Sequence, residues 1–329
     1  MIRVARRLFS SDAPKLASAA LDPITHFIFG ANTDIGKTVL TAALLRASYE
    51  PGSISSSSTH YIKPLQCGGS DESFIRRNAP GLSSAKTLFD WDTPASPHIA
   101  SRIEDKPVSD EQVLESLNGH LHVLENASAT ATNEKGASSS SSGGGGNRSS
   151  IWIETAGGVL SPSSSSPHNS APYHARNDDS LGGWGWVTQA DLYKSYRDRS
   201  SIVLVGDGRL GGISATLASL EATLNRNYRV GGILLLRDDN SSEEDTNKEA
   251  LQEYVESRAS LPSLVDDALR PRTMQSGLFA NPEKSIVSLP KLPPEPEPLD
   301  EWYASGQVKD QISSFVHDHL FCSYDDEAV

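Results

Sequence analysis

Short apolar runs alternate with helical patterns along this chain. Continuous apolar runs predict buried strands at 25–29, 59–64, 151–153, 202–205, 230–236 and 285–289. Apolar residues at helical spacing predict helices at 38–49, 109–125 and 213–227, and an amphipathic C-terminal helix through Trp302, Val308, Ile312, Phe315 and Val316. Strands that are apolar throughout, rather than alternating, are typical of a parallel sheet with helices on both faces. We therefore expect one α/β domain.

Polar residues mark where these elements begin and end. Ser70 and Asp71 look like a capped helix start, and Ser109 with Gln112 has the spacing of a capping box. Pro64 should end the second strand, because proline cannot donate a hydrogen bond to a ladder.

Two stretches have the composition of disordered insertions. Residues 127–150 carry almost no hydrophobic content, and residues 161–180 are rich in serine, proline and histidine. We interpret both as insertions within a single domain at 21–298. Residues 299–329 then form the C-terminal helix and tail.

Composition and charge narrow the class of protein. The chain has 329 residues, 37% of them hydrophobic, and a formal net charge of −13, which argues against nucleic-acid or anionic-membrane partners. No apolar run approaches the roughly 20 residues that cross a bilayer. Two cysteines, Cys67 and Cys322, provide no disulfide framework, which indicates a reducing compartment.

The first twenty residues differ from the rest. Arg3, Arg6, Arg7 and Lys15 are interleaved with apolar residues, and Asp12 is the only acid. This pattern resembles a mitochondrial transit peptide over 1–20, which would place the protein in the matrix. The alternative is an ordinary frayed basic N-terminus.

The loop between the first strand and the first helix carries the strongest chemical signal. Residues 30–38 read Gly-Ala-Asn-Thr-Asp-Ile-Gly-Lys-Thr. Such a loop aims backbone N–H groups and a helix N-terminus at one point, which favours a phosphate chain. Lys37 would reach the β/γ-phosphates, and the Thr38 hydroxyl would coordinate Mg²⁺. The loop is one residue longer than the strict P-loop pattern, so an ordinary strand–turn–helix is the alternative.

Two further strand ends carry charged residues. Lys63 lies near the end of the second strand, and Glu154 follows the strand at 151–153 together with Gly157 and Gly158. Open α/β sheets bind their ligands at the carboxyl ends of strands. Taken singly, Lys63 reads as a surface lysine, Asp71 as a helix cap and Glu154 as a solvated loop acid.

Seven stretches, in unchanged order, resemble the dethiobiotin synthetase family. They are residues 30–38, 63–65, 70–71, 94–98, 154–158, 186–189 and 210–215. The sequence Glu-Thr-Ala-Gly-Gly at 154–158 is more similar to the eukaryotic mitochondrial form, in which the synthetase precedes a diaminopelargonate aminotransferase. The resemblance implies a P-loop NTPase-like fold, a homodimer, and an aminotransferase partner that is fused or separate.

The resemblance also implies a reaction. 7,8-Diaminopelargonate, CO₂ (or bicarbonate) and ATP would give dethiobiotin, ADP and phosphate, in biotin biosynthesis. One amine captures CO₂ as a carbamate, whose oxygen attacks the γ-phosphate to form a carbamic–phosphoric anhydride. The second amine closes the ureido ring. Holding carbamate and triphosphate face to face requires cations between them, and this chain offers Lys37, Lys63 and Mg²⁺.

The family's site residues carry over position by position. Catalytic roles fall on Lys63, Lys37 and Thr33. The implied ATP contacts are Asp34, Ile35, Gly36, Lys37, Thr38, Val39, Glu154, Gly157, Pro290 and Lys291. The implied Mg²⁺ ligands are Thr38, Asp71 and Glu154. The implied substrate contacts are Thr33, Lys63, Cys67, Gly157, Gly158, Leu210, Gly211 and Ser214. The loop at 206–212 could be a second phosphate site, but in the family it reaches the partner subunit's substrate.

Three positions depart from the family or stay open. Leu236 falls where the family has an asparagine that contacts adenine, so either base discrimination is relaxed or Asn240 or Lys291 replaces it. Ser214 stands where many members have asparagine. His98 forms an active-site wall or is simply structural.

Two other functions compete with this one. A P-loop ATPase of the partitioning or nitrogenase-reductase kind would carry an extra lysine early in the loop, where this chain has none. A catalytically degenerate regulatory half of a bifunctional enzyme would fit the altered Leu236 and Ser214. The presence of Lys37, Thr38, Lys63, Asp71 and Glu154 argues against that degeneration.

Overall fold

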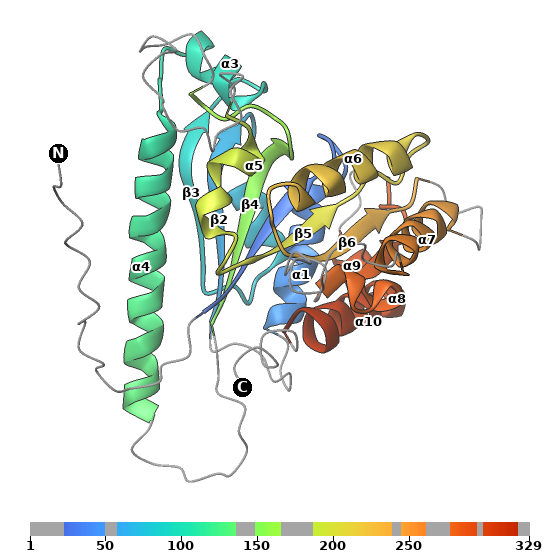
Figure 1. The fold of residues 1–329 in the computed structure, drawn as a ribbon. Coiled ribbons are helices and arrows are strands. Elements are labelled where there is room, and N and C mark those ends of the chain that lie inside the picture. Colours follow the sequence, from blue (N-terminus) through green and yellow to red (C-terminus); the bar gives the residue numbers. More distant parts are fainter. Residues whose placement is uncertain are drawn as a thin grey trace, which may run out of the picture.

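Seven strands form one parallel sheet in the computed structural model of this chain (Figure 1). The structure describes residues 23–49, 58–135, 149–165, 187–238, 245–260, 277–294 and 299–321. The strands are β1 Ile24–Gly30, β2 Thr59–Cys67, β3 Ser84–Trp91, β4 Ser150–Gly158, β5 Ser201–Val205, β6 Val230–Leu236 and β7 Ile286–Leu289. Their order across the sheet is β3-β2-β4-β1-β5-β6-β7, with every pairing parallel. The predicted P-loop NTPase-like α/β fold is confirmed.

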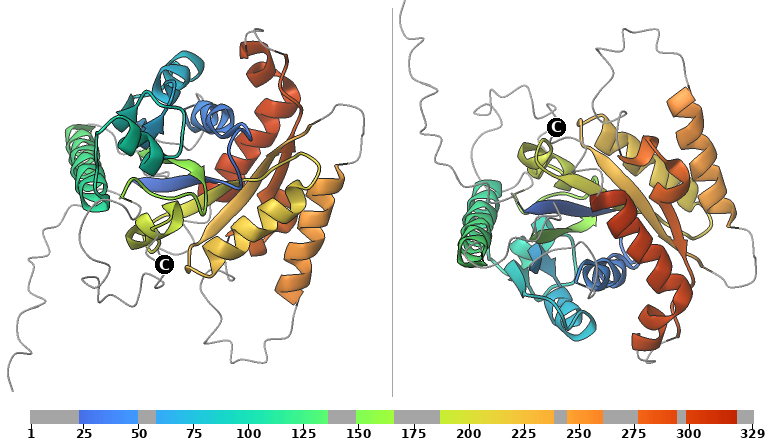
Figure 2. Two further views of the ribbon diagram at one scale, coloured as in Figure 1. Left: turned by 90° about the horizontal axis from the view of Figure 1, so that it is seen from above. Right: turned by 90° about the horizontal axis from the view of Figure 1, so that it is seen from below.

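Helices cover both faces of this sheet, as the two views in Figure 2 show. The α-helices are α1 Lys37–Ser48, α2 Asp71–Asn78, α3 Pro97–Ile103, α4 Asp110–Lys135, α5 Gln189–Leu192, α6 Gly212–Leu224, α7 Thr246–Ser260, α8 Pro282–Ser285, α9 Asp300–Ala304 and α10 Gly306–Ser314. Short 3₁₀ turns lie at Lys194–Tyr196 and Gly277–Phe279, and α10 continues as a π-helix over Phe315–Phe321.

Two hydrophobic clusters lie on the two faces of the sheet. One cluster packs β-strand residues such as Phe27 and Ile153 against α4, α5, α6 and α7. The other packs Ile28 and Trp152 against α1, α2, α9 and α10. Alternate residues of one strand therefore enter different clusters, which is why the strands read as continuous apolar runs.

Several predicted boundaries were wrong. Pro64 does not end β2, because the ladder with β4 already stops at Ile62 and the ladder with β3 passes from Lys63 to Leu65. α4 runs on to Lys135, so the first part of the predicted insertion at 127–150 is helical. At the end of that stretch, Ser150 already belongs to β4.

The second predicted insertion also begins too early. Ser163 is fully buried and its N–H donates to the carbonyl of Val187 at 2.8 Å, so residues 161–165 belong to the fold. Residues 136–148 and 166–186 lie outside the described residues. The predicted transit peptide at 1–20 also lies outside them.

The parallel strands bring three functional loops to one end of the sheet. β1 lies between β4 and β5, and β2 lies on the other side of β4. The carboxyl ends of β1, β2 and β4 therefore meet, and the loop to α1, the turn to α2 and the end of β4 share one region (Figure 1). Strand ends of this kind are where open α/β sheets place their ligands.

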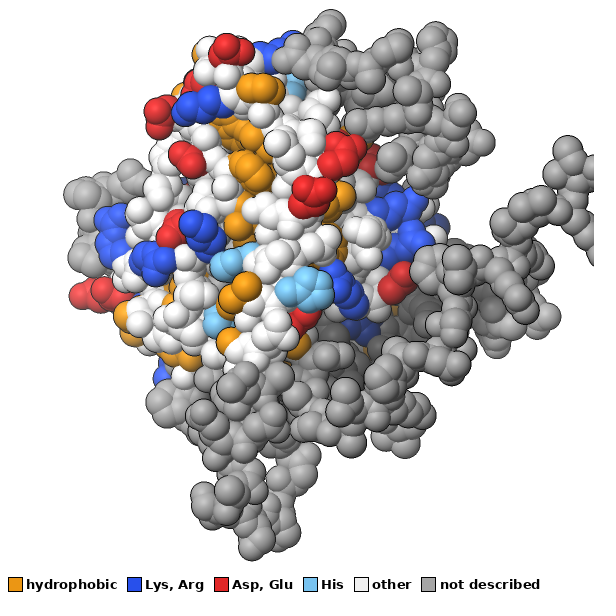
Figure 3. Space-filling model, turned by 90° about the vertical axis from the view of Figure 1, so that its left-hand side faces the viewer, with side chains coloured by type: hydrophobic (Ala, Val, Ile, Leu, Met, Phe, Trp, Pro, Cys, Tyr) orange, Lys and Arg blue, Asp and Glu red, His pale blue; other side chains and the backbone are white. Residues whose placement is uncertain are grey.

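The face that carries α4 mixes side chains of every type. Figure 3 shows hydrophobic, basic, acidic and histidine side chains interleaved on it. Single exposed apolar residues, among them Ile103 on α3 and Val123 on α4, are ordinary on a protein surface. None of the described helices is long and apolar enough to cross a membrane.

A buried histidine makes the stability of this fold sensitive to acid. His26 in β1 is fully buried, stacks on Trp152 with ring centroids 4.4 Å apart, and shares a 2.7 Å hydrogen bond with Ser201. Burial, helped by the charge of Arg229, lowers the pKa of His26 from 6.5 to about 3. His26 thus stays neutral in the folded state at pH values where the unfolded chain protonates it.

We expect the unfolding free energy to fall as pH drops from about 6.5 toward 3. The stabilisation is complete above the unfolded pKa and declines by about 1.4 kcal/mol per pH unit for each such histidine within that window. Urea unfolding of wild type and His26→Phe at several pH values should show a flatter pH dependence for the variant. His122→Gln is the control, because the His122 side chain is 74% exposed. Equal slopes for wild type and His26→Phe would contradict the prediction.

Candidate functional site

The loop between β1 and α1 has the backbone geometry of an anion cradle. Gly36 is the N-cap of α1 with φ 81°, a left-handed conformation that favours glycine, and Asp34 is also left-handed at φ 54°. No side chain among the described residues caps the start of this helix, so its first N–H groups face the loop without a side-chain acceptor from them.

Lys37 folds back over this loop. Its Nζ donates to the carbonyl oxygen of Gly157 at 2.8 Å, which ties the loop to the end of β4. A Cβ atom on Gly30 would lie 2.9 Å from the backbone carbonyl oxygen of Asn32 as well as 2.9 Å from this Nζ, so the loop leaves no room for a side chain there. Burial, together with the nearby charge of Lys63, lowers the pKa of Lys37 to about 8.

Lys63 sits at the centre of a buried charge cluster. Its Nζ lies 2.8 Å from Oε1 of Glu154 and 2.6 Å from Oδ2 of Asp71. The same Glu154 oxygen accepts from the Thr38 hydroxyl at 3.0 Å, and Oε2 accepts from Tyr61 at 3.3 Å. Residues from β2, α2, β4 and α1 thus converge on one point, although Lys63 and Glu154 lie in the middle of β2 and β4 and not at the predicted strand ends.

These contacts fix the charge state of the cluster. Burial opposes the charged form of Lys63, but the carboxylates of Glu154 and Asp71 outweigh it and raise its pKa. Burial likewise opposes ionised Glu154, yet Lys63 and Lys37 hold its pKa below the usual range. Glu154 is fully buried, so the cluster is an ion pair removed from water rather than a surface contact.

A cavity of about 620 Å³ opens beside this cluster. Most predicted site residues line it, namely Thr33, Asp34, Gly36, Lys37, Thr38, Val39, Lys63, Cys67, Asp71, Glu154 and Gly157. Sequence reasoning did not assign the other lining residues, namely Leu65, Gln66, Gly68, Pro94, Ala95, Ser96, Pro97, Ala156 and Ser161. The volume is large enough for a small-molecule ligand.

The other predicted site residues lie away from this wall. Gly158 and Ile35 are buried, while Pro290 and Lys291 follow β7. Leu210, Gly211 and Ser214 are exposed where β5 passes into α6, with Leu210 fully exposed. Their predicted role toward a partner subunit stays a prediction.

Cys67, His98 and Leu236 have defined surroundings. Burial raises the pKa of Cys67 to about 11, so its thiol stays protonated at the cavity wall. His98 is buried in the first turn of α3, where Nδ1 lies 2.9 Å from the Ser96 hydroxyl. Leu236 packs against the loop, since a Cβ on Gly36 would lie 2.2 Å from its Cδ1. Asn240 lies outside the described residues.

The donor set around Lys63 fits a magnesium ion. Among the described residues, no group of three or more histidine, cysteine, aspartate or glutamate side chains gathers as a metal cluster. Thr38, Asp71 and Glu154 instead offer one hydroxyl and two carboxylates on the cavity wall. Mg²⁺ prefers oxygen ligands and keeps several waters, so three protein oxygens suffice.

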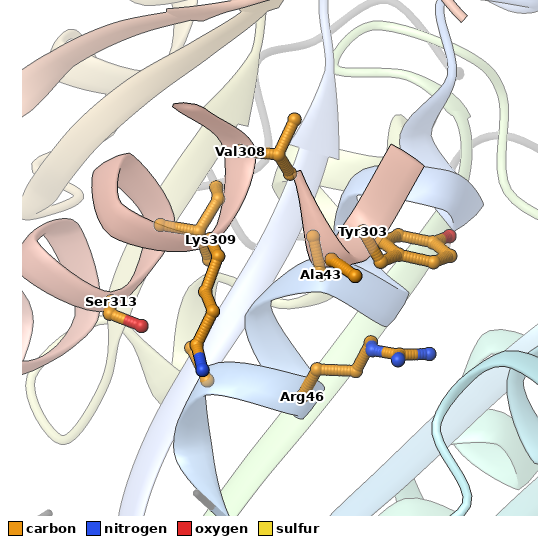
Figure 4. Close-up of a pocket in the computed structure, with 9 residues that line it drawn as sticks. Ala43, Arg46, Tyr303, Val308, Lys309 and Ser313 are labelled. Atoms are coloured by element: carbon orange, nitrogen blue, oxygen red, sulfur yellow. The ribbon is translucent and has the colours of Figure 1, made fainter. Parts of the chain in front are cut away.

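A second, smaller cavity lies on the other side of α1, between that helix, α9 and α10 (Figure 4). Its volume is about 210 Å³, below the usual range for ligand pockets. The guanidinium of Arg46 already donates to the Asn78 carbonyl and to Asp300, and it stacks over the Tyr303 ring. These contacts fasten α9 to α1.

Comparison with known proteins places these motifs in context. A family model described as an AAA domain matches residues 25–132. The bifunctional dethiobiotin synthetase/adenosylmethionine-8-amino-7-oxononanoate aminotransferase of Emericella nidulans is 31% identical over 294 residues, which cover 88% of this chain and 30% of that protein. These matches confirm the resemblance to dethiobiotin synthetases. The mitochondrial bifunctional dethiobiotin synthetase/7,8-diamino-pelargonic acid aminotransferase of Oryza sativa subsp. japonica is 30% identical over 264 residues, covering 63% of this chain and 27% of that protein.

A single-function relative matches over most of its own length. The ATP-dependent dethiobiotin synthetase BioD of Neorickettsia sennetsu is 24% identical over 251 residues, covering 73% of this chain and 87% of that protein. The chain therefore spans less than a third of the two fused relatives but aligns with most of this synthetase. The solved structure of pNOB8 ParA bound to nonspecific DNA has a TM-score of 0.44 at 12% identity, covering 93% of this chain and 99% of that chain.

Proposed function

We propose that this chain is an ATP- and Mg²⁺-dependent dethiobiotin synthetase. It carboxylates 7,8-diaminopelargonate with CO₂ and closes the ureido ring through a carbamic–phosphoric anhydride. The observation that carries the proposal is the meeting of Lys37, Lys63, Thr38, Asp71 and Glu154 at one cavity.

The electrostatics of the cavity suit a reaction between two anions. A carbamate and a triphosphate repel each other strongly in a site of low dielectric, so cations must lie between them. Lys63 has a raised pKa, so it serves as a fixed positive charge and not as a base. Thr33 lies on the same wall and would hydrogen-bond the carbamate.

The nucleotide phosphates would lie over the loop and Lys37. In that position the phosphates would accept the Nζ proton that Gly157 accepts here. When bound, Mg²⁺ supplies charge neutralisation at the phosphate oxygens. Thr38, Asp71 and Glu154 would hold it, with Asp34 close to the phosphate chain.

One assay tests this proposal. The chain from about Leu21 onward is supplied with diaminopelargonate, bicarbonate and MgATP, while dethiobiotin and phosphate are followed together. We expect phosphate release to depend on the diamine and to match dethiobiotin formed. Phosphate release that ignores the diamine would instead indicate a plain P-loop ATPase, and no turnover would favour a degenerate regulatory half.

Base discrimination gives a second expected outcome. Leu236 has no hydrogen-bonding group, and an apolar contact separates similar ligands only weakly. We expect turnover with ATP and GTP to differ by less than about tenfold. Measuring kcat/KM with ATP, GTP and CTP checks this. A strong ATP preference lost in Lys291→Ala would show that Lys291 reads the base.

We also propose a homodimer in the mitochondrial matrix, with an aminotransferase as fused or separate partner. The exposed Leu210, Gly211 and Ser214 on one surface support a subunit contact there. The plant relatives carry mitochondrial and bifunctional names, which supports the location and the partner.

A further inference from the structure

The turn between β2 and α2 is built from two consecutive left-handed glycines. Gly68 has φ 66° and Gly69 has φ 60°, and nothing would meet a Cβ on Gly69 within 4 Å. Glycines offer no side chain to hold such a turn, and they give the backbone its greatest freedom. Yet this turn sets the position of Asp71, the first residue of α2, which contacts Lys63 at 2.6 Å.

The side chain of Gln66 spans that turn from within. Its Nε2 donates to the carbonyl oxygen of Gly68 at 2.7 Å, and its Oε1 accepts from the backbone N–H of Asp71 at 3.4 Å. The orientation of the amide is fixed by these partners, because a carbonyl can only accept and an N–H can only donate. Gln66 is 6% exposed and lines the cavity, so its contacts are shielded from bulk water.

We propose that Gln66 is a positioning residue that locks the glycine turn and so aims the Asp71 carboxylate at Lys63 and the magnesium position. The proposal rests on the function proposed above and adds a residue to its metal site. The Gly68 N–H also donates to the Trp91 carbonyl at 2.8 Å, which anchors one end of the turn. The Gln66 side chain reaches from Gly68 to Asp71 and so ties the two ends together.

The Asp71 N–H is one of the first donors of α2, which have no partner inside the helix. Ser70 caps the Ser73 N–H at 3.1 Å, and Gln66 takes the Asp71 N–H. Loss of Gln66 would therefore leave the helix itself capped and loosen mainly its first residue. The loss would change the direction of the Asp71 carboxylate and leave the fold intact.

Gln66→Met tests this, because methionine keeps the length and volume but removes both hydrogen bonds. Mn²⁺ replaces Mg²⁺ as the probe, and its binding to the full chain with ADP is followed by electron paramagnetic resonance, without turnover. We expect the apparent Mn²⁺ dissociation constant to rise about tenfold, with thermal melting close to wild type. Asp71→Asn should raise it at least as much.

Gln112→Met is the matched control. The amide oxygen of Gln112 also accepts from a backbone N–H, that of Ser109 at 2.8 Å, but at the start of α4. We expect the Gln112→Met variant to bind Mn²⁺ as tightly as wild type does. If Gln66→Met does not fold, Gln66→Asn replaces it, since its shorter arm cannot reach both partners.

The outcomes separate this inference from the proposed function. The positioning role is overturned if the Gln66 variant binds Mn²⁺ as tightly as wild type does. It is also overturned if wild type with ADP binds no Mn²⁺. Absence of dethiobiotin from the wild-type assay overturns the function, whatever the Mn²⁺ titrations give.

Discussion

Replacing Lys63 with methionine is expected to reduce dethiobiotin formation by at least about 10²-fold while leaving nucleotide binding largely intact. Lys63 contacts Glu154 and Asp71 and lies on the cavity wall, whereas the phosphate cradle consists of the 30–38 loop and Lys37. The variant thus removes the cation between the two proposed anions and keeps the groups that would bind the triphosphate. The loss should appear in kcat rather than in the dissociation constant for ADP.

The measurement combines product formation with ADP titration at a temperature where the variant is folded. Lys284→Met is the matched control, because Lys284 lies exposed on α8, away from the cavity. A variant that still makes dethiobiotin at a rate near wild type would remove Lys63 from the mechanism. A variant that loses ADP binding as well would place Lys63 in the nucleotide cradle instead.

The charged centre of the site could be predicted from sequence because its signals are local. Lys37 and Thr38 follow a glycine loop, and Lys63 and Glu154 follow short apolar runs, although both lie in the middle of the longer strands β2 and β4. These strands are parallel neighbours in a register that pairs Ile62 with Ile153, so the two charged residues still meet. The resemblance to one family supplied Asp71, which on its own reads as a helix cap, and the structure shows that it is the first residue of α2 as well.

Elements with weak hydrophobic patterns were missed. β3 is an edge strand whose residues Lys86 and Asp90 are exposed, so its apolar content is too low to read as a buried strand. α7 buries only Leu251 and Val255, which give no helical stripe in the sequence. In both cases tertiary packing overrides a faint local signal.

Gln66 could not be identified from sequence at all. It lies within an apolar strand, and its role depends on two left-handed glycines that follow it and on a helix start five residues away. The pattern Gln-Cys-Gly-Gly-Ser-Asp indicates a turn, but it does not say which backbone atoms the glutamine reaches. Only the three-dimensional path of the turn shows that one amide bridges it.

Replacing Glu154 with glutamine should lower the unfolding free energy by about 3–5 kcal/mol. Glu154 is fully buried and accepts from Lys63, Thr38 and Tyr61. Without its charge, Lys63 remains buried with only Asp71, whose side chain is 26% exposed, as a close anion. A buried cation that loses its buried partner and keeps a partly exposed one costs more than a lost surface pair.

The double variant Lys63→Met/Glu154→Gln distinguishes this electrostatic cause from lost packing. Removing both charges leaves no buried ion unpaired, so the double variant should be more stable than Glu154→Gln alone, with a coupling energy of about 1–3 kcal/mol. It should also be inactive, since Lys63 is absent. Urea unfolding of the four proteins at pH 7 measures the cycle. Asp300→Asn, which affects only an exposed pair with Arg46, should change stability by less than about 1 kcal/mol. If the losses of the two single variants simply added in the double variant, Lys63 and Glu154 would not be coupled, and the cluster could not hold charge at the cavity as the proposed reaction requires.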